Sequence, residues 1–206
     1  MKFSKIAAIM KKSKTAILFL DKDGMQWLSN GAAIYKLKDM PDLDEDTVLT
    51  VMGVADDQKD KWNTASRTDD MGMLADRVYN EEEITADDAG VCIISNGKRL
   101  VPIYTCDGML WIDAALMAPM ERKEEGYIRF FLREIEGKRV LAVKEGLILT
   151  AIILEVDTWR DTGSSDRLKN LVHCIRAEEF RRTKSNAILD ETLCDEENRE
   201  VEEDDG

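Results

Sequence analysis

The hydrophobic residues of the chain come in short runs between turn signals, and the first such group predicts a helix followed by three strands. Residues 4–12 carry apolar side chains at helical spacing and predict a short helix. Apolar runs follow at 16–20, 26–29 and 32–37, and the pairs Asp23-Gly24 and Asn30-Gly31 separate them. Because Asn-Gly and Asp-Gly favour tight hairpin turns, these runs predict an antiparallel meander.

The same order of elements returns about 110 residues later. Residues 112–118 predict a second short helix, and apolar runs at 128–132, 139–143 and 147–156 predict three more strands. Glu136-Gly137 and Glu145-Gly146 mark the turns between them. We therefore predict an α+β fold in which two helix-plus-three-strand units form a pseudo-two-fold repeat. The sheets are expected to be antiparallel, with the short helices on one face.

The remaining segments complete a predicted domain over residues 1–156, with units at about 1–54 and 91–156. Residues 47–54 predict a further strand, and residues 91–104 a hairpin around Asn96-Gly97. The acidic stretch 55–90 is interpreted as a connector with a short helix at 73–79. Residues 157–189 predict a C-terminal helical segment, and residues 190–206 a disordered acidic tail.

The net charge of −13 is concentrated at the C-terminal end. Residues 190–206 hold ten acidic side chains and one basic one, which leaves a charge of about −4 for residues 1–189. The acidic composition therefore does not exclude a nucleic-acid partner for the folded part. No apolar segment reaches transmembrane length and no secretory leader is recognisable, so we expect a cytoplasmic protein without a membrane partner.

The motifs of common catalytic and metal sites are missing from the sequence. No phosphate-binding glycine loop, no Gly-x-Ser-x-Gly and no Cys-x-x-Cys occurs, and His173 is the only histidine. The acidic pairs Asp56-Asp57 and Asp69-Asp70 do not have the spacing of an EF-hand loop. We predict a protein that is not an enzyme and uses no metal or cofactor. The alternative is an enzyme with an unrecognised carboxylate or thiol site, for which His173-Cys174 is one candidate.

The first helix has two different faces on a helical wheel. Ser4 is its expected N-cap, and the apolar side is formed by Phe3, Ile6, Ile9 and Met10. The opposite side is small and basic, with Lys5, Lys11 and Lys12. Either these lysines only solvate an amphipathic helix, or they form a surface that binds an anionic partner.

Two units of this element order, each with an alanine-rich short helix, resemble the building block of DNA sliding clamps, the ring-shaped processivity factors of replicases. The resemblance covers roughly residues 1–54 and 91–156 and rests on element order. It implies sheets on the outside of a ring and helices that face double-stranded DNA with basic side chains. Carried onto this sequence, the DNA-facing residues would be Lys5, Lys11, Lys12, Lys14, Arg122 and Lys123.

The resemblance implies a non-enzymatic protein that associates with DNA or with replication and repair partners. This chain holds one domain's worth of units, so a ring would require a homo-oligomer of about six copies. Asp113 in the second helix departs from the basic pattern of the family. The alternative function is an α+β adaptor for protein–protein interaction that does not bind DNA.

Overall fold

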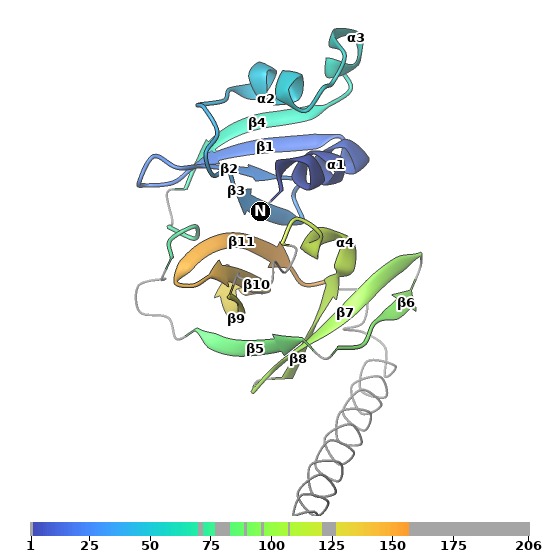
Figure 1. Ribbon diagram of the computed structural model, residues 1–206, viewed down its shortest axis with the longest axis vertical. Coiled ribbons are helices and arrows are strands. Elements are labelled where there is room, and N and C mark those ends of the chain that lie inside the picture. The colour runs from blue at the N-terminus through green and yellow to red at the C-terminus, as the bar shows by residue number, and fades with distance from the viewer. Residues whose placement is uncertain are drawn as a thin grey trace, which may run out of the picture. The chain divides into compact units, whose positions relative to one another are not determined.

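In the computed structural model, the two predicted meanders form the middle of one sheet (Figure 1). The structure describes residues 2–69, 72–76, 83–88, 90–95, 97–106, 108–120 and 127–156. All of these belong to the first of the two compact units, Met1–Asp157 and Thr158–Gly206, into which the chain divides. The first group of elements is α1 (Phe3–Ser13), β1 (Thr15–Leu20), β2 (Gln26–Ser29) and β3 (Ala33–Lys36). The second is α4 (Ala114–Met117), β9 (Ile128–Ile135), β10 (Lys138–Glu145) and β11 (Ile148–Leu154).

The mixed α/β character predicted from the sequence is confirmed, and the two meanders join edge to edge. β3 pairs antiparallel with β11, with Ile34 opposite Ile152. The central strands therefore run in the order β1-β2-β3-β11-β10-β9. Positive φ values at Gly31 (85°) and Gly146 (65°) occur at the turns that the sequence marks, where glycine is the residue that adopts them without strain.

The sheet extends beyond the meanders on both sides, and its added strands were only partly predicted. The remaining strands are β4 (Asn63–Thr68), β5 (Ile84–Asp88), β6 (Ile93–Ser95), β7 (Lys98–Thr105) and β8 (Gly108–Asp113). β6 and β7 form the hairpin predicted for residues 91–104. β4 and β5 come from the segment interpreted as a connector, and β8 includes two residues that were assigned to the second helix. β4 pairs in parallel with β1, so the sheet is mixed rather than purely antiparallel.

Residues 47–54, predicted as a strand, are mostly helical. The helix is α2 (Glu45–Val51), followed by the short α3 (Asp56–Lys59). Asp44 caps α2, because its side chain accepts hydrogen bonds from the backbone of Asp46 and Thr47, and Thr47 Oγ1 accepts from the backbone of Asp44. Such a capping box stabilises a helix start and favours the helix over the predicted strand. The helix predicted at 73–79 is also wrong for residues 73–76, which form turns and bends; residues 77–79 lie outside the described part.

The larger hydrophobic core lies between the sheet and its helices. It contains Ile6 and Met10 of α1, Val48 of α2 and Leu116 of α4. Alternate residues of β10 divide between two cores, since Leu141 and Val143 join this one while Val140 and Ala142 join the second. The second core holds Trp27, Leu149 and Ile152, and Leu74 from the loop 72–76 contributes to it. Hence α1, α2 and α4 share one face of the sheet.

Candidate functional site

Helix α1 carries most of the predicted binding residues, and its position is set by its apolar side. Ile6, Ala7 and Met10 are buried against the sheet. The helix begins after Lys2, which is the N-cap in place of the predicted Ser4, and no side chain caps it. It ends at Lys14, whose left-handed backbone (φ 51°) lets its N–H bond to the Met10 carbonyl. Lys11 and Lys12 occupy the last turn, where the helix dipole favours positive charge.

The predicted lysines of α1 do not form one uniform surface. Lys11, Lys12 and Lys14 are exposed, whereas Lys5 is half-buried and takes part in an interaction of its own. The amino group of Lys11 lies 3.8 Å from the position that a side chain on Gly53 would occupy, so it reaches toward the end of α2. Lys12 instead lines a groove beside α4. Arg122 and Lys123, the other two predicted residues, lie outside the described part of the chain.

A groove lies beside Lys12 in the described part of the chain. Its volume is about 490 Å³. Its walls come from the end of α1, the turn between β2 and β3, α4 and the end of β11. Its lining is formed by Ile9, Lys12, Ser13, Asn30, Ala32, Lys98, Asp113, Ala115, Leu116, Leu154, Glu155 and Val156. Both helix-plus-three-strand units therefore contribute to one site.

Lys98 was not predicted from the sequence. It begins β7 directly after the turn at Gly97, and it faces the same groove as Lys12. The sequence marks the turn clearly, yet nothing local to residue 98 indicates that this hairpin lies beside α1. The two lysines line one groove only because β7 continues through β8 into α4, which packs on the same face as α1.

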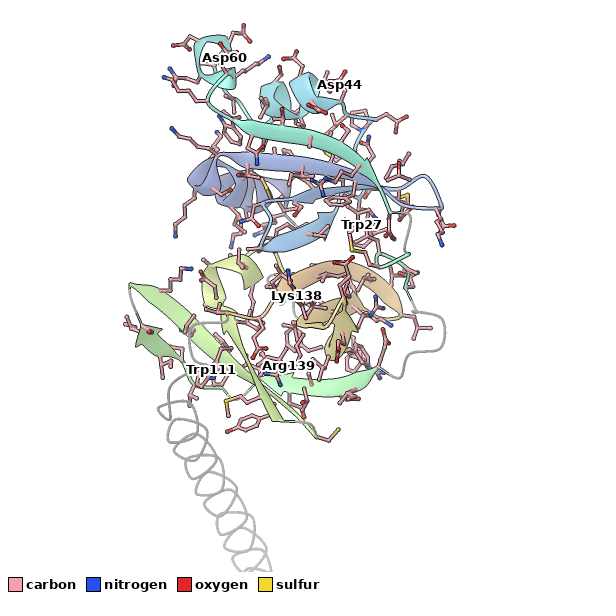
Figure 2. All side chains as sticks on the ribbon, turned by 180° about the vertical axis from the view of Figure 1, so that it is seen from behind. Trp27, Asp44, Asp60, Trp111, Lys138 and Arg139 are labelled. Atoms are coloured by element: carbon pink, nitrogen blue, oxygen red, sulfur yellow. The ribbon has the colours of Figure 1, made fainter. Side chains whose placement is uncertain are left out.

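The acidic residues of the groove are already engaged by neighbouring groups. Both carboxylate oxygens of Glu155 accept hydrogen bonds from Arg139, at 2.5 and 3.0 Å. Arg139, labelled in Figure 2, also donates to the Met109 carbonyl at 3.1 Å. Asp113 accepts from the backbone N–H of Ala115 and so caps α4. Arg139 therefore offsets the charge of Glu155, and Asp113 is used to cap α4.

A further charged cluster lies on the opposite face of the sheet and is structural. Arg133, whose side chain is 1% exposed, pairs with Glu83 and donates to the carbonyls of Met73, Ala75 and Asp76. Lys144 bonds the second oxygen of Glu83 at 2.5 Å. Burial alone would raise the pKa of Glu83, but the hydrogen bonds from Lys144 and Arg133 outweigh it and hold that pKa below its usual value. The cluster fastens the loop 72–76 to the sheet.

The residues considered for metal or thiol chemistry are not gathered in the described part of the chain. Asp69 is buried and accepts hydrogen bonds from the backbone of Met73 and Leu74, so it shapes a loop. The described residues contain no group of three potential metal ligands. Cys92 is exposed and accepts a hydrogen bond from Arg99 at 3.1 Å. His173-Cys174 lies outside the described residues.

In the described part of the chain, no helix has the length and apolar character needed to cross a membrane. Comparison of the sequence with protein-family models and with curated proteins, and of the fold with solved structures, finds no match in any of the three.

Proposed function

We propose that this chain is a non-enzymatic, clamp-like protein that associates with double-stranded DNA through the exposed lysines of α1. The observation that carries the proposal is the placement of α1 and α4 on the same face of one continuous sheet. Leu116 of α4 joins the core that α1 covers, and the backbone N–H of Lys2 donates to the Pro119 carbonyl at 3.3 Å. Figure 1 shows the two helices beside the central strands.

The clamp-like element of the proposal rests on the strand order. The meanders β1-β2-β3 and β9-β10-β11 meet at the antiparallel pair β3–β11. On each side of this pair, the last strand of a meander lies innermost and its first strand lies outermost. A helix precedes each meander in the chain. This arrangement supports a pseudo-two-fold repeat of the kind that the resemblance implies.

The distribution of charged side chains on this face favours DNA binding at the side of α1 that faces the groove. The neighbouring helices α2 and α3 carry acidic first turns, formed by Glu45, Asp46, Asp56 and Asp57. Lys59 offsets part of that charge by pairing with Asp46 and Asp56. Asp44 and Asp60 stand at this same end of the molecule in Figure 2. A phosphate backbone would be repelled there and attracted by the exposed Lys11, Lys12 and Lys14.

Mechanistically, the lysine ammonium groups would contact phosphate oxygens without reading base sequence. Such contacts release counterions and permit movement along the duplex. α4 has no basic residue among Ala114–Met117, so one copy offers few contacts. Association of a single copy with DNA should therefore be weak, and stronger if several copies act together.

The test is DNA binding by a variant with Lys11, Lys12 and Lys14 each changed to Gln. Glutamine removes the charge but keeps most of the side-chain stem. The matched control changes Lys22, Lys38 and Lys138, which are also exposed and lie outside α1. In fluorescence anisotropy with a labelled duplex at low salt, we expect the α1 variant to lose most binding and the control to retain it. Equal loss in both variants would reject the role of α1.

Assembly of several copies into a ring can be tested by measuring the mass of the protein in solution. Light scattering on a sizing column, over a range of protein concentrations, should give a stable multiple of the 23.4 kDa chain if copies close into a ring. A monomer at every concentration would reject the ring. The proposal would then be a clamp-like module that binds DNA as a single copy.

A protein-binding adaptor is the second candidate, and one observation favours it. Tyr127, Leu147 and Ile148 are 65%, 82% and 53% exposed, and they lie together at the end of the β9–β10–β11 meander, where Gly146 N–H donates to the Tyr127 carbonyl. Exposed apolar groups of this kind occur at protein interfaces. Under this alternative, Leu147→Ser would abolish partner capture while DNA binding would be absent from the outset.

A further inference from the structure

The groove between α1 and α4 has an apolar floor. The side chains that form it are Ile9, Ala32, Leu116, Leu154 and Val156. Its volume of about 490 Å³ falls within the range of about 300–1,000 Å³ that is usual for sites of small organic ligands. An aliphatic or aromatic body of modest size would therefore find both room and apolar contact.

Three hydrogen-bond donors belong to residues that line this groove, and they have no acceptor among the described residues. Two are the ammonium groups of Lys12 and Lys98, which come from α1 and β7. The third is the amide nitrogen of Asn30, whose oxygen accepts from the backbone of Ala32 and Ala33 and so fixes the orientation of the side chain. Donors of this kind favour a ligand that supplies oxygen acceptors, above all an anionic one.

The acids in the lining do not cancel this preference. Arg139 neutralises Glu155 through two hydrogen bonds. Asp113 uses one oxygen to cap α4 and has no cationic partner among the described residues. The five charged groups, Lys12, Lys98, Arg139, Asp113 and Glu155, together carry one net positive charge.

We infer that this groove binds a small amphipathic anion, an apolar chain or ring with one terminal carboxylate or phosphate. The apolar body lies on the floor, and the anionic head accepts hydrogen bonds from Lys12, Lys98 and Asn30. This site shares Lys12 with the proposed DNA contacts and differs from them in its use of Lys98, Asn30 and the apolar floor.

The test uses octanoate and octyl phosphate as probes, with octylammonium as a cation that has the same apolar chain. Each is titrated into the full-length protein while amide chemical shifts are followed by NMR. We expect either anion to shift the amides of Ser13, Asn30 and Ala115 in a saturable way, and octylammonium to leave them unchanged. The relative affinity of the two anions tells which head group the site prefers.

Three variants locate the site. Lys12→Gln with Lys98→Gln should weaken anion binding about tenfold, since two partly exposed ion pairs are lost. Ala115→Trp should block binding, because residue 115 is exposed on α4 and lines the groove, so that the indole fills it. Lys11→Gln is the matched control, since Lys11 lies on the same helix but reaches toward Gly53.

Several outcomes would overturn the inference. They are saturable binding that shifts amides elsewhere, equal binding of octylammonium, no binding of either anion at millimolar concentration, and an affinity that the Lys12/Lys98 variant leaves unchanged. The proposed function is judged separately. Loss of duplex binding in the Lys11/Lys12/Lys14 variant does not require any response to octanoate, and the reverse also holds.

Discussion

The hydroxyl of Tyr35 in β3 donates a 2.7 Å hydrogen bond to the backbone carbonyl of Leu116 in α4, 81 residues further along the chain. Tyr35 is fully buried. The bond joins a strand of the first helix-plus-three-strand unit to the helix of the second. It also holds α4 at the groove, since Leu116 is one of the residues that line it.

Tyr35→Phe should therefore lower the free energy of unfolding by about 1–2 kcal/mol, because a buried hydrogen bond is lost while the ring is kept. Urea denaturation followed by circular dichroism measures the change. Tyr127→Phe is the control, since Tyr127 is 65% exposed and its hydroxyl only accepts a 3.3 Å hydrogen bond from Arg129. If both variants unfold at the same urea concentration as the wild type, the bond does not stabilise the fold.

The same tyrosine predicts a loss of stability in alkali. Burial, aided by the nearby charge of Asp113, raises the pKa of Tyr35 well above its usual value. In the unfolded chain the phenol ionises near pH 10, so its contribution is complete below about pH 10 and declines as the pH rises further. Above pH 10, wild type should lose more stability than Tyr35→Phe. Parallel stability curves for the two proteins would contradict the prediction.

The buried cluster around Glu83 predicts a larger effect. Glu83→Gln removes the negative charge that faces Arg133 and Lys144, whose side chains are 1% and 8% exposed. Because unpaired buried charges are costly, the free energy of unfolding should fall by about 3–5 kcal/mol. Glu134→Gln, an exposed substitution in the same strand as Arg133, should have little effect in the same urea titration.

Acid should weaken the same cluster. The pKa of Glu83 is lowered in the fold, so its contribution is complete above the usual glutamate pKa of about 4.3 and is lost as the pH falls through the lower, folded value. The stability difference between wild type and Glu83→Gln should be constant near neutral pH and shrink below about pH 4. A difference that does not change down to pH 3 would show that the fold does not lower the pKa of Glu83.

The proposed DNA contacts predict a shallow dependence on salt. Three phosphate contacts by Lys11, Lys12 and Lys14 give a slope of log K against log salt of about −2.7 for one copy. Each single Lys→Gln change should reduce the slope by about 0.9 and weaken all duplex sequences alike. A slope that stays the same in all three variants would assign the phosphate contacts to other residues.

The sequence by itself determined the local elements of the two meanders. Ile6, Met10 and their neighbours fix the buried side of α1 through helical spacing, and Asn30-Gly31 and Glu145-Gly146 fix turns through their backbone preferences. These signals act over a few residues, so they can be recognised without knowing what lies nearby. The strand predicted at residues 47–54 was wrong, because the capping box at Asp44 starts the helix α2 there.

Only the tertiary structure decided which distant segments meet. The pairing of β3 with β11, the parallel addition of β4 to β1 and the contact of Arg133 with Glu83 all join residues far apart in the chain. Hydrogen bonding between strand edges does not depend on side-chain sequence, so no local pattern specifies these partners. For the same reason Lys12 was predicted as a surface residue, but the groove that it shares with Lys98 was not, because that groove exists only when both helices pack on one face of the sheet.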